Sequence, residues 1–231
     1  MLRILLIFNL LFIVASYGQE EQLSFSEAIS IHLPKYKEKA DKAYRLKNVE
    51  RAEFLFDSLV NNCLKGSRLD DFQVRNLKKD PVRLDEFQKP VYLMTNASWV
   101  VSNRGEIPAL NKLAAKYHEQ VDFVVLFWDN RQTVKDLAKQ YDSHIKVLYV
   151  DELQNNSSYV VRSMKHSLGL PTTFLLDKDK KILDIRRKVS HAYGIDFEKS
   201  FNLNFDSFSK AISVLLIEDS SQYSAAATDS K

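Results

Sequence analysis

Two apolar runs of strand length, separated by an amphipathic segment, constrain the fold of this chain more than any other feature of its sequence. The runs are VYLMTN (residues 91–96) and VDFVVLFW (residues 121–128). The second is apolar almost throughout, as expected for a strand that is buried on both faces of a sheet. Apolar residues recur between them at helical spacing, namely Leu110, Leu113, Ala114 and Tyr117. This order predicts a central sheet covered by helices.

The alternation of strands and helices continues along the chain and defines one domain over residues 72–217. Further elements are predicted from periodicity and turn residues: a β-hairpin within 72–87, a helix around 134–141, a strand over 145–151, a helix over 157–169, an antiparallel strand pair on either side of 178–181, and a helix within 197–217. The antiparallel pair makes the sheet mixed. The predicted fold class is therefore α/β, with a mixed sheet flanked by helices.

Residues 26–66 lie ahead of this domain and predict two antiparallel helices. The helical periodicity breaks at Leu46-Lys47-Asn48, where Asn48 suits the N-cap of the second helix. Gly66 suits the end of that helix. We therefore expect an N-terminal helical hairpin. At the other end of the chain, residues 218–231 have nothing to bury, which predicts a disordered tail.

The first residues have the plan of a secretory signal peptide. Arg3 precedes an apolar run from Ile4 to Val14, and small residues follow as far as Gly18. The run is shorter than the roughly 20 residues that a membrane-spanning helix needs. We expect residues 1–18 to be a cleaved signal peptide and the mature chain to be exported without stable membrane insertion. Retention of the segment as a membrane anchor is the alternative.

Charge and composition exclude several kinds of partner and site. The 33 basic and 30 acidic residues are scattered, and the net charge is only +3, so we expect no nucleic-acid partner. The five histidines show no pair at metal-ligand spacing, and one cysteine cannot build a thiolate-rich zinc site. We therefore expect neither a metal nor a cofactor. A single cysteine also rules out an intramolecular disulfide, so the packed core alone must stabilise the fold.

The segment after the first apolar run resembles the active-site turn of a known family. Residues 99–110 read WVVSNRGEIPAL. This matches the pattern W-C-x-x-C-R-x-E-x-P-x-L of exported, TlpA-type redoxins with a thioredoxin-like fold, except at both cysteines. Their positions hold Val100 and Asn103, so the C-x-x-C motif is degenerate (Val100-Val101-Ser102-Asn103). The resemblance implies a thioredoxin-like domain over 72–217, with Asn103 in the first turn of a helix.

A second segment supports the same resemblance. Residues 169–174, GLPTTF, are similar to the loop and strand that carry the cis-proline of this family, which would be Pro171. The resemblance implies that Pro171 faces the turn, that Trp99 packs close to it, and that the backbone of Leu170 can pair with an extended polypeptide. Taken as a bare sequence position, Trp99 is equally suited to the core.

The chemistry of the family depends on sulfur that these positions lack. Dithiol exchange needs one thiolate to attack a disulfide and a second thiol to resolve the mixed disulfide. Val100 offers no lone pair, and Asn103 is neither a nucleophile nor a redox centre at neutral pH. The remaining thiol, Cys63, shares a helical stripe with apolar residues, which favours a small buried hydrophobe. A thiol that pairs between chains and a catalytic thiol are the alternatives.

Two functions are compatible with these residues. The first is an exported binding module that has lost dithiol catalysis and holds a protein or peptide partner through Trp99, Leu170 and Pro171. The second is a thiol-disulfide oxidoreductase or antioxidant protein that acts through Cys63 or through the thiols of a partner. The sequence alone does not decide whether the chain is an enzyme. The resemblance implies the periplasm or cell envelope of a bacterium, or secretion.

Overall fold

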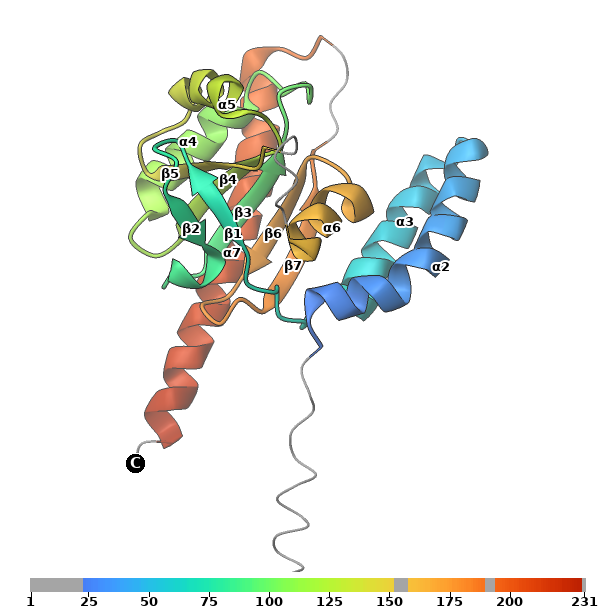
Figure 1. Cartoon of the computed structure of the whole chain (residues 1–231), viewed down its shortest axis with the longest axis horizontal. Coiled ribbons are helices and arrows are strands. Elements are labelled where there is room, and N and C mark those ends of the chain that lie inside the picture. Colours follow the sequence, from blue (N-terminus) through green and yellow to red (C-terminus); the bar gives the residue numbers. More distant parts are fainter. Residues whose placement is uncertain (1–22, 152–157, 190–193, 230–231) are drawn as a thin grey trace, which may run out of the picture.

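The computed structural model describes residues 23–151, 158–189 and 194–229, and a seven-stranded mixed sheet lies at its centre (Figure 1). The strand order is β2-β1-β5-β4-β3-β6-β7. The strands are β1 (Gln73–Asn76), β2 (Pro81–Arg83), β3 (Val91–Asn96), β4 (Asp122–Phe127), β5 (Ile145–Tyr149), β6 (Thr172–Leu176) and β7 (Ile182–Arg187).

Helices cover both faces of the sheet, and the two N-terminal helices stand to one side of it (Figure 1). They are α2 (Phe25–Arg45), α3 (Val49–Leu59), α4 (Glu106–Tyr117), α5 (Arg131–Leu137), α6 (Tyr159–Leu168) and α7 (Phe197–Asp229). Single turns of other helix types lie at η1 (Val60–Leu64), η2 (Leu84–Glu86) and η3 (Ala138–Gln140). In the described residues, no helix has the length and apolar character needed to cross a membrane.

Strand pairing places the two predicted motifs at one end of the sheet. Strand β3 runs parallel to β4 and antiparallel to β6. The register pairs Thr95, at the carboxyl end of β3, with Thr172, at the start of β6. The segment that follows Asn96 and the loop that precedes Thr172 therefore emerge side by side.

The side chains of β3 alternate between two apolar cores, as period-two strand geometry requires. Val91 and Leu93 join a core that contains the hairpin α2–α3 and α6. Tyr92 and Met94 join a second core, which contains α4 and α7. This two-sided burial explains why the runs at 91–96 and 121–128 are apolar almost throughout.

The helical hairpin is fixed to the sheet by Arg187, at the end of β7. Its guanidinium donates to the hydroxyl of Tyr44 at 2.9 Å and to that of Tyr36 at 3.0 Å. It also lies 4.0 Å from the centre of the Phe56 ring. Since Tyr36 and Tyr44 belong to α2 and Phe56 to α3, one residue of the edge strand holds both helices.

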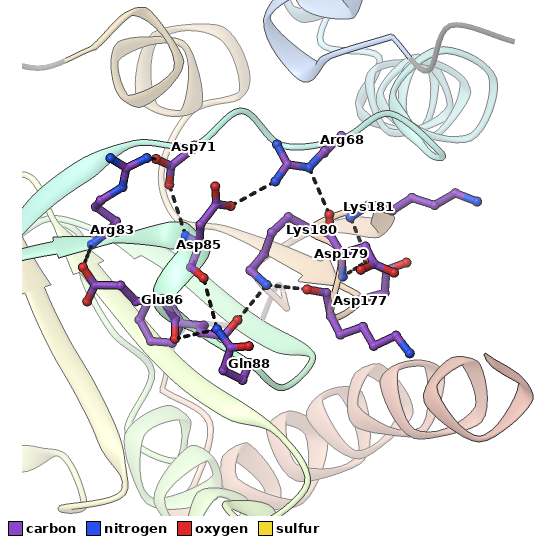
Figure 2. Close-up of polar contacts among 12 residues, drawn as sticks. Arg68, Asp71, Arg83, Asp85, Glu86, Gln88, Asp177, Asp179, Lys180 and Lys181 are labelled. Carbon is purple, nitrogen blue, oxygen red and sulfur yellow. Dashed lines mark hydrogen bonds and ion pairs between the residues drawn. The ribbon is translucent and has the colours of Figure 1, made fainter. Parts of the chain in front are cut away.

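A cluster of charged residues lies at the end of the sheet opposite Pro171 and joins three segments of the chain there (Figure 2). Lys180 is buried and donates from Nζ to the carbonyl of Phe87 at 2.8 Å. Burial lowers the pKa of this ammonium below its usual value. Arg68 pairs with Asp85 at 3.0 Å and donates to the carbonyl of Asp179 at 3.1 Å. These contacts join the segment that leaves the hairpin to the β6–β7 turn.

The structure confirms the predicted fold class and most of the predicted elements. Both helices of the hairpin form, and Asn48 caps the second by accepting from the N–H of Arg51 at 2.9 Å. The β-hairpin within 72–87 forms as β1 and β2, followed by the turn η2. The predicted signal peptide, residues 1–18, lies outside the described residues.

The prediction of a disordered tail from residue 218 differs from the structure, in which α7 continues to Asp229. The reason is local. Residues 218–229 contain no proline or glycine, and they include the run Ala225–Ala227, the residue type with the highest helix propensity. A segment without apolar residues to bury can therefore still extend a helix that is already nucleated.

The anchoring by Arg187 predicts that Arg187→Met destabilises the fold. The apolar stem would keep its packing, but two hydrogen bonds and a cation–π contact would be lost, which together contribute about 2 kcal/mol. Chemical denaturation should report this fall in the free energy of unfolding. Arg51→Met is the matched control, because Arg51 stacks on the exposed ring of Phe54 at 5.1 Å; a comparable loss there would contradict the assignment.

Candidate functional site

The site is built around the turn that joins β3 to α4, residues 97–105. Its first part is tied to the end of β4. The N–H of Trp128 donates to the carbonyl of Asn96 at 3.0 Å, and Ser98 donates to the carboxylate of Asp129 from both its N–H, at 2.7 Å, and its hydroxyl. The turn is therefore held by the neighbouring parallel strand and its loop.

The second part of the turn is held by α7. The N–H of Gly105 donates to the hydroxyl of Ser200 at 3.1 Å. A Cβ atom at residue 105 would lie 2.2 Å from the backbone nitrogen of Phe201, so only glycine allows this approach. The requirement comes from packing between two backbone segments and is independent of any reaction.

Helix α4 begins later than the family resemblance implies. The prediction that Asn103 lies in the first turn of the helix is wrong, because α4 starts at Glu106 with Gly105 as its N-cap. The carbonyl of Asn103 instead accepts from the N–H of Glu106 at 3.0 Å, a tight turn that precedes the first α-helical bond, from Ala109 to Gly105.

The two degenerate positions are half-buried, and two apolar side chains of the turn face solvent. Val100 and Asn103 are partly covered, and the amide of Asn103 donates to the carbonyl of Val189 at 3.3 Å. Trp99 is 65% exposed and Val101 is 86% exposed. Trp99 is therefore a surface residue of the turn, and the alternative that placed it in the core is wrong.

The proline loop lies at the same end of the sheet. The peptide bond between Leu170 and Pro171 is cis. Thr172 donates from its N–H to the hydroxyl of Thr95 at 3.1 Å, and that hydroxyl donates to the carbonyl of Thr172 at 2.8 Å. In the part of the chain that the structure describes, no hydrogen bond uses the N–H or the carbonyl of Leu170. The loop is thus clamped to β3 by Thr172, and Leu170 is partly buried against the core that contains α6.

A buried ion pair lies beneath the turn. Nζ of Lys188 is 2.8 Å from Oε2 of Glu106 and donates to the carbonyl of Val101 at 2.5 Å. The same carboxylate oxygen accepts from the N–H of Asn103 at 3.1 Å. Lys188 therefore links the segment after β7 to both halves of the turn. Sequence analysis did not identify this residue, because a lysine that follows Arg186 and Arg187 and lies 82 residues from Glu106 carries no local signal of the pairing.

A small cavity separates this ion pair from Pro171. It is lined by Glu106, Pro171, Lys188 and Tyr92 among others, and its volume is about 20 Å³, which is enough for about one water molecule. Burial raises the pKa of Tyr92 far above its usual value, so this hydroxyl stays protonated. The cavity can therefore hold about one water molecule beside this hydroxyl.

Cys63 lies in the helical hairpin and not in this turn. It belongs to η1, is partly buried, and packs against the core formed by the hairpin and one face of the sheet. The other residues that line its cleft all come from α2 and α3, among them Tyr36 and Leu59. The structure thus gives the thiol an apolar contact on one side and partial solvent access on the other.

The described residues contain no group of three or more histidine, cysteine or acidic side chains that could hold a metal ion. The structure does bring two histidines together that the sequence kept apart. The rings of His118 and His144 lie 3.9 Å apart, each with an acidic neighbour, Glu119 and Asp142. The pair lies at the far end of α4 and does not contribute to the turn.

The buried ion pair predicts a non-additive pair of substitutions. Lys188→Met leaves the carboxylate of Glu106 buried without its cation and should reduce the free energy of unfolding by about 3 kcal/mol. The double variant Glu106→Gln, Lys188→Met removes both charges and should be more stable than Lys188→Met alone. Denaturant unfolding of the four proteins of this cycle measures the coupling, and additive losses would show that the ion pair contributes no coupling.

Comparison with known proteins finds similarity to bacterial thiol-disulfide oxidoreductases and thioredoxin-like proteins. It is 31% identical over 121 residues to the thiol-disulfide oxidoreductase ResA of Bacillus thuringiensis subsp. konkukian, a match that covers 51% of this chain and 66% of that relative. It is 29% identical over 126 residues to the thioredoxin-like protein YneN of Bacillus subtilis, covering 52% of this chain and 70% of that relative. The chain thus spans slightly less than two thirds of the length of the ResA relative.

Solved structures of similar fold include redox proteins of other bacteria. The thioredoxin domain of a thiol-disulfide oxidoreductase from Bacteroides vulgatus has a TM-score of 0.48 and 17% identity, covering 63% of this chain and 96% of that one. A thio-disulfide isomerase from Thermus thermophilus has a TM-score of 0.46 and 23% identity, covering 64% and 96%. The model of the AhpC/TSA family matches residues 66–185, more than half of the chain. The chain, with its thioredoxin-like fold and its degenerate C-x-x-C segment, belongs to the AhpC/TSA family.

Proposed function

We propose that this protein is an exported, thioredoxin-like binding module that has lost dithiol catalysis and holds an extended polypeptide beside Pro171. One observation carries the proposal: the turn that faces the proline loop holds Val100 and Asn103 at the two thiol positions of the family, and the one cysteine of the chain lies in the helical hairpin.

The loss of catalysis follows from the chemistry of disulfide exchange. A disulfide is cleaved when a thiolate forms a new S–S bond and the second sulfur leaves with the electron pair. The turn offers an isopropyl group and a carboxamide at the positions of the two sulfur atoms. Helix α4 and its buried neighbours persist, but they have no thiol whose pKa they could adjust.

Polypeptide binding is supported by the surface around the proline loop. Leu170 keeps an N–H and a carbonyl that form no hydrogen bond with other described residues, which is the arrangement that an added extended strand requires. Trp99 and Val101 expose apolar surface on the adjacent turn. An extended chain could therefore gain backbone hydrogen bonds and apolar contacts without any covalent step.

A thiol-disulfide oxidoreductase or antioxidant protein is the second candidate. Family membership and the ResA relatives favour it, and the partial solvent access of Cys63 leaves a thiol that a disulfide could reach. This activity would have to proceed through Cys63 alone or with thiols of a partner. The lack of a second sulfur to resolve the mixed disulfide weighs against it.

Export and location form part of the proposal. The chain begins with residues that have the plan of a signal peptide, and we place the mature protein in the periplasm or cell envelope of a bacterium, or outside the cell. The partner would then be an exported protein or peptide.

We predict that the protein does not catalyse disulfide reduction. With dithiothreitol as the electron source, insulin reduction should stay within twofold of the uncatalysed rate for the wild type and for Cys63→Ser alike. Robust turnover that Cys63→Ser abolishes would replace the proposal with the second candidate. The variant Val100→Cys, Asn103→Cys should reach at least ten times the rate of the matched Val100→Ser, Asn103→Ser, which tests whether the scaffold of the turn still supports the reaction.

We also predict that Trp99 contributes to binding of unfolded chains. Fluorescein-labelled insulin B chain, reduced and alkylated so that no disulfide can form, should bind the wild type in an anisotropy titration. Trp99→Ala should weaken this binding at least fivefold, because the exposed ring supplies apolar contact area. Phe54→Ala removes a comparably exposed ring from the hairpin and should change the affinity less than twofold. Equal effects of the two substitutions would contradict the assigned surface.

A further inference from the structure

The helical hairpin carries a cleft that the proposed function does not use. It lies between α2 and α3, has a volume of about 250 Å³, and is lined by residues of α2, α3 and η1 only. The hairpin stands to the side of the sheet, beyond α6 and away from α4, α5 and α7 (Figure 1). The cleft is therefore separate from the turn and from Pro171.

The rim of the cleft is positively charged. Lys35 and Lys39 line it from α2; they are four residues apart, so they lie on the same face of the helix, about 6 Å apart along its axis. His32 lies one turn earlier on the same face. Among the described residues, neither lysine forms an ion pair, and no acidic side chain lines the cleft.

No acidic residue of the two helices lines the cleft. These residues are Glu27, Glu38 and Asp41 on α2, and Glu50, Glu53 and Asp57 on α3. Two lysine side chains, and no carboxylate, thus line the opening. An ion pair between one of these lysines and a carboxylate of an occupant would be only partly buried. Its attraction should therefore weaken strongly as the salt concentration rises.

The floor of the cleft is apolar. Leu55 and Leu59 are buried and line it from α3, while Cys63 lines it from η1. A cationic rim above an apolar floor fits an occupant that carries both carboxylates and short apolar side chains. Because the cleft is open and smaller than the roughly 300 Å³ typical of small-molecule pockets, a segment of polypeptide fits it better than an enclosed small molecule.

We infer that the cleft between α2 and α3 binds an acidic segment of a partner protein, with Lys35 and Lys39 contacting two of its carboxylates. Acidic residues at alternate positions of an extended chain project to one side about 6.7 Å apart, which is close to the spacing of the two lysines. Intervening small side chains would pack towards Leu55 and Leu59. The inference goes beyond the proposed function and holds whether or not the surface at Pro171 binds a polypeptide.

The test uses a fluorescein-labelled peptide with five Glu-Ala repeats and the full chain after signal removal. We expect anisotropy to report saturable binding at low salt, at least tenfold tighter than for the matched peptide with five Gln-Ala repeats. Lys35→Glu, Lys39→Glu should weaken binding at least tenfold. Lys78→Glu, Lys135→Glu changes the net charge equally at exposed residues of other elements and should alter the affinity less than twofold.

The thiol of Cys63 reports where the peptide binds. Bound Glu-Ala peptide should slow alkylation of Cys63 by iodoacetamide, an uncharged reagent, at least fivefold, and the Gln-Ala peptide at the same concentration should not. Equal binding of the two peptides, equal losses in the two lysine variants, or binding without protection of Cys63 would each overturn the inference. Displacement of the peptide by submillimolar inorganic phosphate would show a small-anion site and would overturn it as well.

Trp99→Ala separates this inference from the proposed function. The substitution should leave binding of the Glu-Ala peptide unchanged, because Trp99 lies on the β3–α4 turn and does not line the cleft. A loss of Glu-Ala binding in Trp99→Ala would assign the acidic peptide to the surface at Pro171 and overturn the inference. The affinity of alkylated insulin B chain for Lys35→Glu, Lys39→Glu then measures the surface at Pro171 by itself.

Discussion

The hydrogen bonds between Thr95 and Thr172 are the contact on which the candidate site depends. They join β3 to β6 at the end of the sheet where the turn leaves β3 and the proline loop enters β6. Both hydroxyl and backbone groups are buried, so this clamp is shielded from water and strengthened by the low local dielectric. Because of this clamp, the turn after Thr95 and the loop before Thr172, two residues that are 77 positions apart in the chain, form one surface.

Two residues of the segment that resembles the family's active-site turn have structural roles here. Gly105 is required by the backbone of α7, and Glu106 satisfies the N–H of Asn103 and the ammonium of Lys188. Such contacts stabilise the turn whether or not a thiol is present. Retention of the residues around a degenerate C-x-x-C segment is therefore explained by packing and by burial of charge, and it is not by itself evidence for redox activity.

Local sequence patterns were sufficient to predict most of the helices and strands. The features that they did not predict depend on contacts between residues far apart in the chain. Strands β3 and β4 follow from apolar runs, and Asn48 and Gly66 mark the hairpin, because these signals act within a few residues. The start of α4 depends on Ser200 and Phe201 of α7, which no pattern near Asn103 reveals. Lys188 and Arg187 were missed for the same reason. The exposure of Trp99 could not be predicted either, since a tryptophan beside a strand suits the core and the surface equally.

Arg187 connects the two surfaces for which binding is proposed. It lines the same cavity as Pro171, and it donates to the hydroxyl of Tyr36, which lines the hairpin cleft. The contacts of its guanidinium with both helices fix the distance between the surfaces. A partner that carries an extended segment and an acidic segment could therefore engage both, and the second contact would form at the high effective concentration set by the first. Weak affinity at each surface is therefore compatible with tight binding of the whole partner.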